Sequence, residues 1–286
     1  MLGRYGGRDA KSDDGRTSLA GLKYAMEKAL ERNKDTPKPV ERAKPLHVED
    51  YKAARTRRGN ECIHCHQVNE FRRADAKAAG TWSRDDLWVY PLPENVGLTL
   101  DVDRGDVVKA VVVNSPAAKI GIKAGDVLST LNGYPAASNA DVQYALNKAP
   151  KAGTIPIEWR RGTSQMEGKL ELAAGWRKTN LTWRASMLDI LPSLPISADD
   201  LTAVEKKAIG IPEKQAAFRQ DKFVHSTLKA VGLKAGDVVV ALDGKPVEGS
   251  MDNFLGLVRQ EHLVGDTILL TVLRDGTPVE LRITLK

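Results

Sequence analysis

Two stretches of the sequence are nearly identical: Ile120-Gly-Ile-Lys-Ala-Gly-Asp-Val127 and Val231-Gly-Leu-Lys-Ala-Gly-Asp-Val238. They lie 111 residues apart, and Asn132-Gly133 corresponds to Asp243-Gly244 at the same spacing. A repeat of this kind is explained most simply by two copies of one domain. The fold of the larger part of the chain therefore follows from this repeat.

Each copy can be interpreted as the same series of local structures. In the first copy, a short helix over residues 117–119 ends at Gly121, where a residue without Cβ can take a positive φ. A strand over residues 127–131 and a tight turn follow. Each copy then continues with a main helix and a closing pair of strands: the helices are expected over residues 140–149 and 251–260, and the closing turns at Arg161-Gly162 and Asp275-Gly276.

The segment from Ser115 to Gly133 resembles the Gly-Asp core of bacterial PDZ domains, in the circularly permuted form found in Deg-family periplasmic proteases. The second copy resembles it too, with Ser226-Thr-Leu-Lys229 in place of Ser-Pro-Ala-Ala. The resemblance covers residues 88–173 and 206–286. It implies two PDZ-like β-barrel or sandwich domains in a chain of mixed α+β class.

The resemblance also implies a binding site. PDZ domains bind an extended peptide as an added strand, and N–H groups of a glycine loop hold its terminal carboxylate. In the first copy the residues expected to contact a peptide are Val96, Gly97, Leu98, Thr99, Leu100, Asp141, Val142, Ala145 and Leu146. In the second copy the matching loop is expected at Ala208 to Ile211, followed by Pro212, which has no N–H. We therefore expect the first copy to bind protein C-termini or extended peptides, and the second to bind weakly or to be structural.

The regions outside the repeats give less regular patterns. Residues 18–33 predict an amphipathic helix whose apolar stripe should be buried; the stripe consists of Leu19, Leu22, Met26, Ala29 and Leu30. The expected organisation is an N-terminal helix and proline-containing linker (1–47), a short helical segment that binds haem (48–87), a first PDZ domain (88–173), a linker (174–205) and a second PDZ domain (206–286).

Both cysteines of the chain stand in the stretch Cys62-Ile-His-Cys65-His66. This spacing is typical of c-type haem attachment, in which two thiols tether one covalent haem c and the adjoining imidazole binds its iron. On this interpretation Cys62 and Cys65 bind the cofactor and His66 is the metal ligand. Three alternatives stay open: a dithiol redox pair, chance spacing on a loop, and a zinc site that recruits His47, His225 or His262.

Charge and hydropathy exclude some classes of partner. The net charge is +6, but the basic residues are mixed with acidic ones and no nucleic-acid-binding motif is present. The sequence has no run of eighteen apolar residues, so it predicts no membrane span. Residues 1–17 lack the apolar core of a secretory signal. Because covalent haem is attached outside the cytoplasm, we expect a periplasmic or otherwise extracytoplasmic protein whose export signal lies upstream of a truncated chain.

The sequence leaves two functional hypotheses. It has no Gly-x-Ser-x-Gly, Gly-Asn-Ser-Gly or His-Glu-x-x-His motif, so neither a serine-protease nor a zinc-protease centre is predicted. The first hypothesis is a haem protein that transfers electrons to a redox partner or senses redox state while its first PDZ domain binds a partner. The alternative is a scaffold without haem, which recruits protein C-termini to a partner protease.

Overall fold

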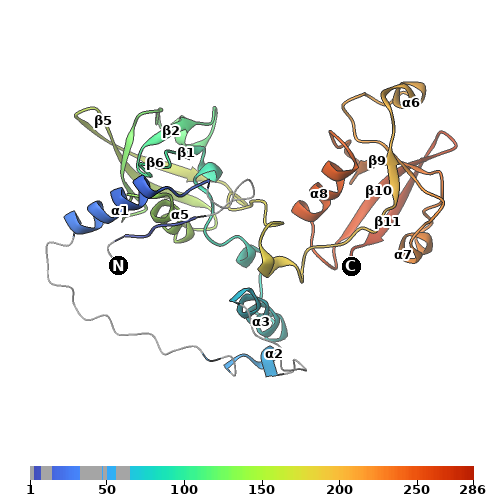
Figure 1. Cartoon of the computed structure of the whole chain (residues 1–286), viewed down its shortest axis with the longest axis horizontal. Helices are drawn as coiled ribbons and strands as arrows, with labels where there is room; N and C mark the ends of the chain where they lie inside the picture. Colours follow the sequence, from blue (N-terminus) through green and yellow to red (C-terminus); the bar gives the residue numbers. More distant parts are fainter. Residues whose placement is uncertain (1–2, 8–14, 33–46, 48–49, 56–64) are drawn as a thin grey trace. The chain divides into compact units, whose positions relative to one another are not determined.

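The computed structural model describes residues 3–7, 15–32, 47, 50–55 and 65–286 of the chain. The chain divides into two compact units, Met1–Trp183 and Arg184–Lys286, each of which is described by itself. Figure 1 traces the chain from the blue helix α1 through the first unit to the orange and red second unit. None of the helices within the described ranges combines the length and the apolar character that crossing a membrane requires.

The first unit contains one PDZ-like domain preceded by short helices. The preceding elements are α1 (Leu19–Arg32), α2 (Lys52–Arg55), α3 (Cys65–Ala78) and the 3₁₀ helix η2 (Arg84–Leu87). The domain consists of η3 (Pro93–Val96), β1 (Leu98–Leu100), β2 (Val108–Val111), α4 (Pro116–Lys119), β3 (Val127–Leu131), β4 (Tyr134–Pro135), α5 (Asn139–Asn147), β5 (Gly153–Arg161) and β6 (Ser164–Leu172). Its strands form a β1-β2 pair and a sheet in the order β4-β3-β5-β6, all antiparallel.

The core of the first domain follows from the alternation of side chains along β5. Ile155, Ile157 and Trp159 are buried, whereas the residues between them are exposed, as expected for a strand with one face on the core. The buried apolar side chains of α5, Val142, Ala145 and Leu146, pack in the same cluster. The helix is therefore fixed against the sheet by apolar contacts.

The second unit repeats this domain with an insertion. Its elements are η4 (Ala185–Met187), β7 (Ala198–Asp200), α6 (Ala203–Ala208), β8 (Phe218–Gln220), α7 (Ser226–Ala230), β9 (Val238–Leu242), α8 (Met251–Glu261), β10 (Thr267–Arg274) and β11 (Thr277–Thr284). The five strands of this unit form one sheet in the order β11-β10-β9-β8-β7. Phe218 and Phe254 meet edge to face in its core, with ring centroids 5.2 Å apart.

The repeated Gly-Asp stretch owes its structure to a buried carboxylate. Asp126 accepts hydrogen bonds from the Lys123 N–H at 2.9 Å and from two nitrogens of Arg161 at 2.8 Å each. Arg161 also donates to the Gly121 carbonyl at the end of α4, at 2.6 Å. Asp237 makes the same contacts with the Lys234 N–H and Arg274. In each domain the motif therefore ties the closing hairpin to the turn that follows the short helix.

The predicted turns and strands of the repeats are confirmed. Asn132 and Gly133 both have positive φ, 51° and 76°, as a two-residue hairpin turn requires. The predicted main helices are present as α5 and α8. However, β7 lies within residues 174–205, which the sequence assigned to a linker, and it forms the edge of the second sheet. The second domain thus begins upstream of residue 206.

The predicted first helix is present as α1, but the prediction that its apolar stripe is buried is wrong. Leu19 is 83% exposed and Leu30 is 71% exposed, whereas Gly21 and Ala25 are buried. The small residues allow the backbone to approach closely, since a Cβ at Gly21 would lie 2.4 Å from the Val102 carbonyl oxygen. Close approach to the first domain, rather than hydrophobic burial, decides which face of α1 points inward.

Candidate peptide-binding site

The loop before β1, which is predicted to hold a peptide carboxylate, has a backbone that requires glycine at one position. The 3₁₀ helix η3 ends at Gly97, which has φ of 87° and passes directly into β1. A Cβ at Gly97 would lie 2.0 Å from the Ser115 hydroxyl oxygen, which itself accepts the Ala118 N–H at the start of α4. Both the positive φ and the close approach therefore require glycine at this position.

The predicted contact residues of the first domain come together from η3, β1 and α5. Their apolar members, Val96, Leu98, Leu100, Val142, Ala145 and Leu146, belong to one core cluster. They are all buried, so a peptide bound at this place would contact mainly the backbone of β1. Within the described residues β1 pairs only with β2, and its second edge carries no strand. The assignment of peptide contacts to these residues stays a prediction.

Sequence reasoning did not indicate that residues near the N-terminus contact this region. The Arg4 N–H donates to Asp141 Oδ1 at 2.9 Å, and Arg16 donates to Glu94 Oε2 at 3.0 Å. Asp141 is 2% exposed, and burial raises the pKa of its carboxyl although the Arg4 N–H opposes this shift. No pattern pointed to these contacts, because both arginines lie in a stretch rich in glycine and charge.

In the second domain the predicted position of the loop is wrong. Residues 208–211 form the end of α6 and the turn after it, not the start of an edge strand. The edge strand is β7, which is preceded by the loop Leu191-Pro-Ser-Leu-Pro-Ile196. The spacing of 111 residues between the two copies does not extend to this loop, because α6 is inserted between β7 and β8.

The two loops can be aligned on the Leu-Pro pair that both contain, Leu92-Pro93 and Leu191-Pro192. Val96-Gly97 of the first domain then corresponds to Pro195-Ile196 of the second. Proline removes one N–H donor, and isoleucine cannot easily take a positive φ. The expectation that the second domain binds peptides more weakly stays a prediction, but its physical basis moves from Pro212 to Pro195.

The Cys-x-x-Cys-His stretch lies only partly within the described residues. Cys62 is outside them, and α3 begins at Cys65. His66 Nδ1 lies 2.9 Å from Glu70 Oε1, one helical turn away. Among the described residues no group of three or more potential metal ligands gathers. Haem attachment stays a prediction, which a Soret band retained after acid–acetone extraction would confirm.

Two of the three histidines considered as zinc ligands, His225 and His262, have partners within the second domain. His225 Nδ1 lies 2.9 Å from Thr227 Oγ1 at the start of α7. His262 Nε2 lies 3.3 Å from Asp243 Oδ2. Both side chains therefore have a local structural role.

Comparison with known proteins agrees with this fold. Residues 107–161 and 224–285 each match a family model described as a PDZ domain. The chain is 29% identical over 154 residues to the periplasmic serine endoprotease DegP of Escherichia coli K12, covering 53% of this chain and 29% of the relative. It is 30% identical over 216 residues to a probable DegP-like periplasmic serine endoprotease of Pseudomonas fulva, covering 70% of this chain and 42% of the relative. A solved structure described as the HtrA-type protease AlgW with tripeptide is 16% identical, with 68% of each chain covered and a TM-score of 0.32.

The chain therefore carries two PDZ domains in tandem. Its curated relatives are of the Deg/HtrA type, and the match spans less than half of their length. The prediction that this chain acts in electron transfer or redox sensing is wrong, because these relatives are serine endoproteases and not cytochromes. A redox partner likewise finds no support among them.

Proposed function

We propose that the chain is an extracytoplasmic PDZ scaffold, whose first domain binds protein C-termini and presents them to a partner protease. The observation that carries the proposal is the passage from Gly97 into β1, whose second edge carries no strand within the described residues. PDZ domains generally bind peptide C-termini at such an edge. The periplasmic description of the relatives supports the location, and their description as endoproteases supports the kind of partner.

The proposal is tested with a fluorescently labelled decapeptide that ends in valine, titrated into the full chain and followed by anisotropy. A matched peptide with an amidated C-terminus is the control. We expect the free acid to bind about tenfold or more tightly than the amide, because charge-assisted hydrogen bonds from the loop to the carboxylate are lost. Equal affinity of the two peptides would contradict carboxylate recognition.

Hydrogen exchange at saturating peptide locates the site. Backbone amides of residues 96–100 should exchange more slowly with peptide bound, because an added strand protects the edge of β1. Amides of residues 196–200, around the second loop and β7, serve as the internal control and should change little. Protection confined to the second region would contradict the assignment to the first domain.

A further inference from the structure

Two short parts of the chain near its start, residues 3–7 and 15–32, lie against the first PDZ domain; we call them the N-terminal segment. Figure 1 shows α1 beside this domain. The segment contacts α5, one wall of the predicted groove, and η3, which leads into the loop before β1. Whether a ligand can reach β1 therefore depends on these contacts.

Arg16 bridges α5 and η3 at the predicted groove. Its guanidinium donates to Glu94 Oε2 of η3 at 3.0 Å and to Asn139 Oδ1 of α5 at 3.4 Å. The Arg16 side chain is only 10% exposed, so it is enclosed between its partners. Gly7 lies against the same side of α5, since a Cβ there would lie 3.5 Å from Gln143 Oε1.

Arg4 holds the segment at the start of α5 through its backbone and its side chain. Its N–H donates to Asp141 Oδ1 at 2.9 Å, and its carbonyl accepts from the Ser138 hydroxyl. Its guanidinium lies 3.3 Å from the centroid of the Tyr144 ring. Asp141 is one of the residues predicted to contact peptide, and its Oδ1 already accepts a hydrogen bond from the segment.

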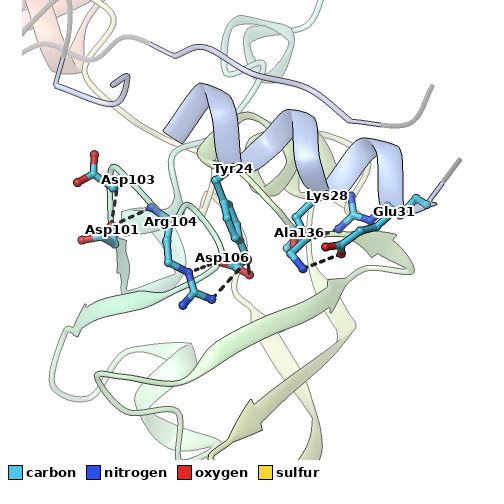
Figure 2. A network of polar contacts seen from close by, with 9 residues as sticks. Tyr24, Lys28, Glu31, Asp101, Asp103, Arg104, Asp106 and Ala136 are labelled. Carbon is cyan, nitrogen blue, oxygen red and sulfur yellow. Dashed lines mark hydrogen bonds and ion pairs between the residues drawn. The ribbon is translucent and has the colours of Figure 1, made fainter. Parts of the chain in front are cut away.

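Helix α1 is attached beyond β1, on the loop that leads from β1 to β2. The Tyr24 hydroxyl donates to Asp106 Oδ2 at 2.5 Å, and Arg104 donates to the same hydroxyl at 3.4 Å (Figure 2). Arg32 donates to the Ala136 carbonyl at 3.3 Å, near the start of α5. The helix is thus attached near its middle, at Tyr24, and at its C-terminal end, at Arg32.

These attachments are polar, and they can be exchanged for water at small net cost per bond. The larger apolar side chains of α1, Leu19 and Leu30 among them, are exposed while the helix is docked. Detachment of α1 therefore exposes little further apolar surface. A contact of this kind suits a reversible cover better than a permanent part of the core.

We propose that the N-terminal segment is a tethered competitor that covers the peptide groove of the first PDZ domain. A protein C-terminus binds only after the segment has moved away. The inference rests on the proposed function and adds its regulation. If the uncovered state is populated to about 1–10%, the apparent affinity for peptide is about 10–100-fold weaker than that of the open groove.

The test compares peptide affinity in full-length variants, with the valine-ended decapeptide as the probe. The double substitution Arg16→Ala and Tyr24→Phe removes the side-chain contacts to Glu94, Asn139 and Asp106. We expect it to tighten binding by about tenfold or more. The matched control is Lys23→Ala, which removes only an ion pair within α1, between Lys23 and Glu27 at 3.9 Å, and should leave the affinity unchanged.

The two levels of the proposal fail in different ways. Equal affinity of the double variant and the wild-type chain overturns the tethered competitor and leaves the proposed function standing. Absence of binding by both overturns the proposed function and the inference with it. Tryptophan fluorescence checks that the variants remain folded, since Trp159 is buried in the first domain.

A second measurement needs no variant. An isolated helix of 14 residues is only marginally stable in water, so α1 should lose hydrogen-exchange protection once it is displaced. Saturating peptide should therefore speed exchange of the amides of residues 19–32 in the wild-type chain. Unchanged protection of α1 at saturation overturns the inference.

Discussion

Replacing Asp126 by asparagine should destabilise the first PDZ domain and leave the second unaffected. Asp126 is 2% exposed on its side chain and receives three hydrogen bonds, two of them from the Arg161 guanidinium. Asparagine keeps the size of the side chain, but it removes the charge and turns an NH₂ group toward a donor. The substitution therefore breaks the tie between the closing hairpin and the Gly-Asp turn.

The expected magnitude follows from the exposure of the two partners. Removing one member of a fully buried ion pair costs about 3–5 kcal/mol. The Arg161 side chain is 38% exposed and can regain water once its partner is changed, which reduces the loss. We expect the free energy of unfolding to fall by about 2–3 kcal/mol. With a urea dependence of about 2 kcal/mol per molar, the midpoint of unfolding should fall by about 1–1.5 M.

The positions of the tryptophans provide a selective assay. All five tryptophans of the chain lie in residues 1–183, so their fluorescence reports the first unit alone. Urea unfolding of the full chain by fluorescence should show the shift for Asp126→Asn. The matched variant Asp237→Asn makes the same change in the second domain and should leave the fluorescence midpoint in place, while circular dichroism detects its effect.

A substitution of Arg161, the other member of the ion pair, gives a second measurement. Arg161→Ala leaves Asp126 buried without its cation, and a buried carboxylate cannot regain water as an exposed guanidinium can. Arg161→Ala should therefore cost at least as much as Asp126→Asn. A fluorescence midpoint for Asp126→Asn equal to that of the wild-type chain would refute the reasoning.

Three further predictions concern pH, the second domain and α8. Burial raises the pKa of Asp126 and Asp237. Hydrogen bonds from arginine and backbone N–H groups together lower it by more than burial raises it, so both pKa values lie below the ordinary range. The two ionised carboxylates stabilise the folded domains fully above the unfolded pKa of about 3.9, and this stabilisation is lost as the pH falls through the folded pKa. The urea midpoint of unfolding should therefore decline in acid, and it should decline less in Asp126→Asn. The double substitution Pro195→Val and Ile196→Gly restores the residues of the first loop to the second domain and should raise the peptide stoichiometry from one to two by calorimetry. Gly256 lies inside α8 with no heavy atom within 4 Å of an added Cβ, so Gly256→Ala should stabilise the second domain by about 0.5–1 kcal/mol in urea unfolding followed by circular dichroism.

The local signals of the repeat were sufficient to predict its turns, short helices and strands. They reside in short stretches, such as Asn132-Gly133, where the residue types require a particular backbone conformation. The edge strand β7 was not predicted, because the three residues of this strand show no alternation and include two aspartates. Its position in the sheet depends on pairing with β8, which lies beyond an inserted helix.

The orientation of α1 illustrates a different limit. A hydrophobic stripe normally predicts the buried face of a helix, but it contains no information on close backbone contacts. Gly21 packs against the Val102 carbonyl, and the polar partners of Tyr24 lie on a loop about eighty positions further along the chain. The cover on the first groove could therefore be found only from the three-dimensional structure.

The short strand at the edge of the second sheet also bears on how the protein avoids self-association. An unpaired strand edge offers free backbone groups to other chains and is a common starting point for aggregation. β7 has only three residues, and Asp199 and Asp200 are both exposed on it. Few hydrogen bonds are available there, and any chain that approaches meets two negative charges, so this edge of the second sheet is a poor site for pairing between copies of the protein.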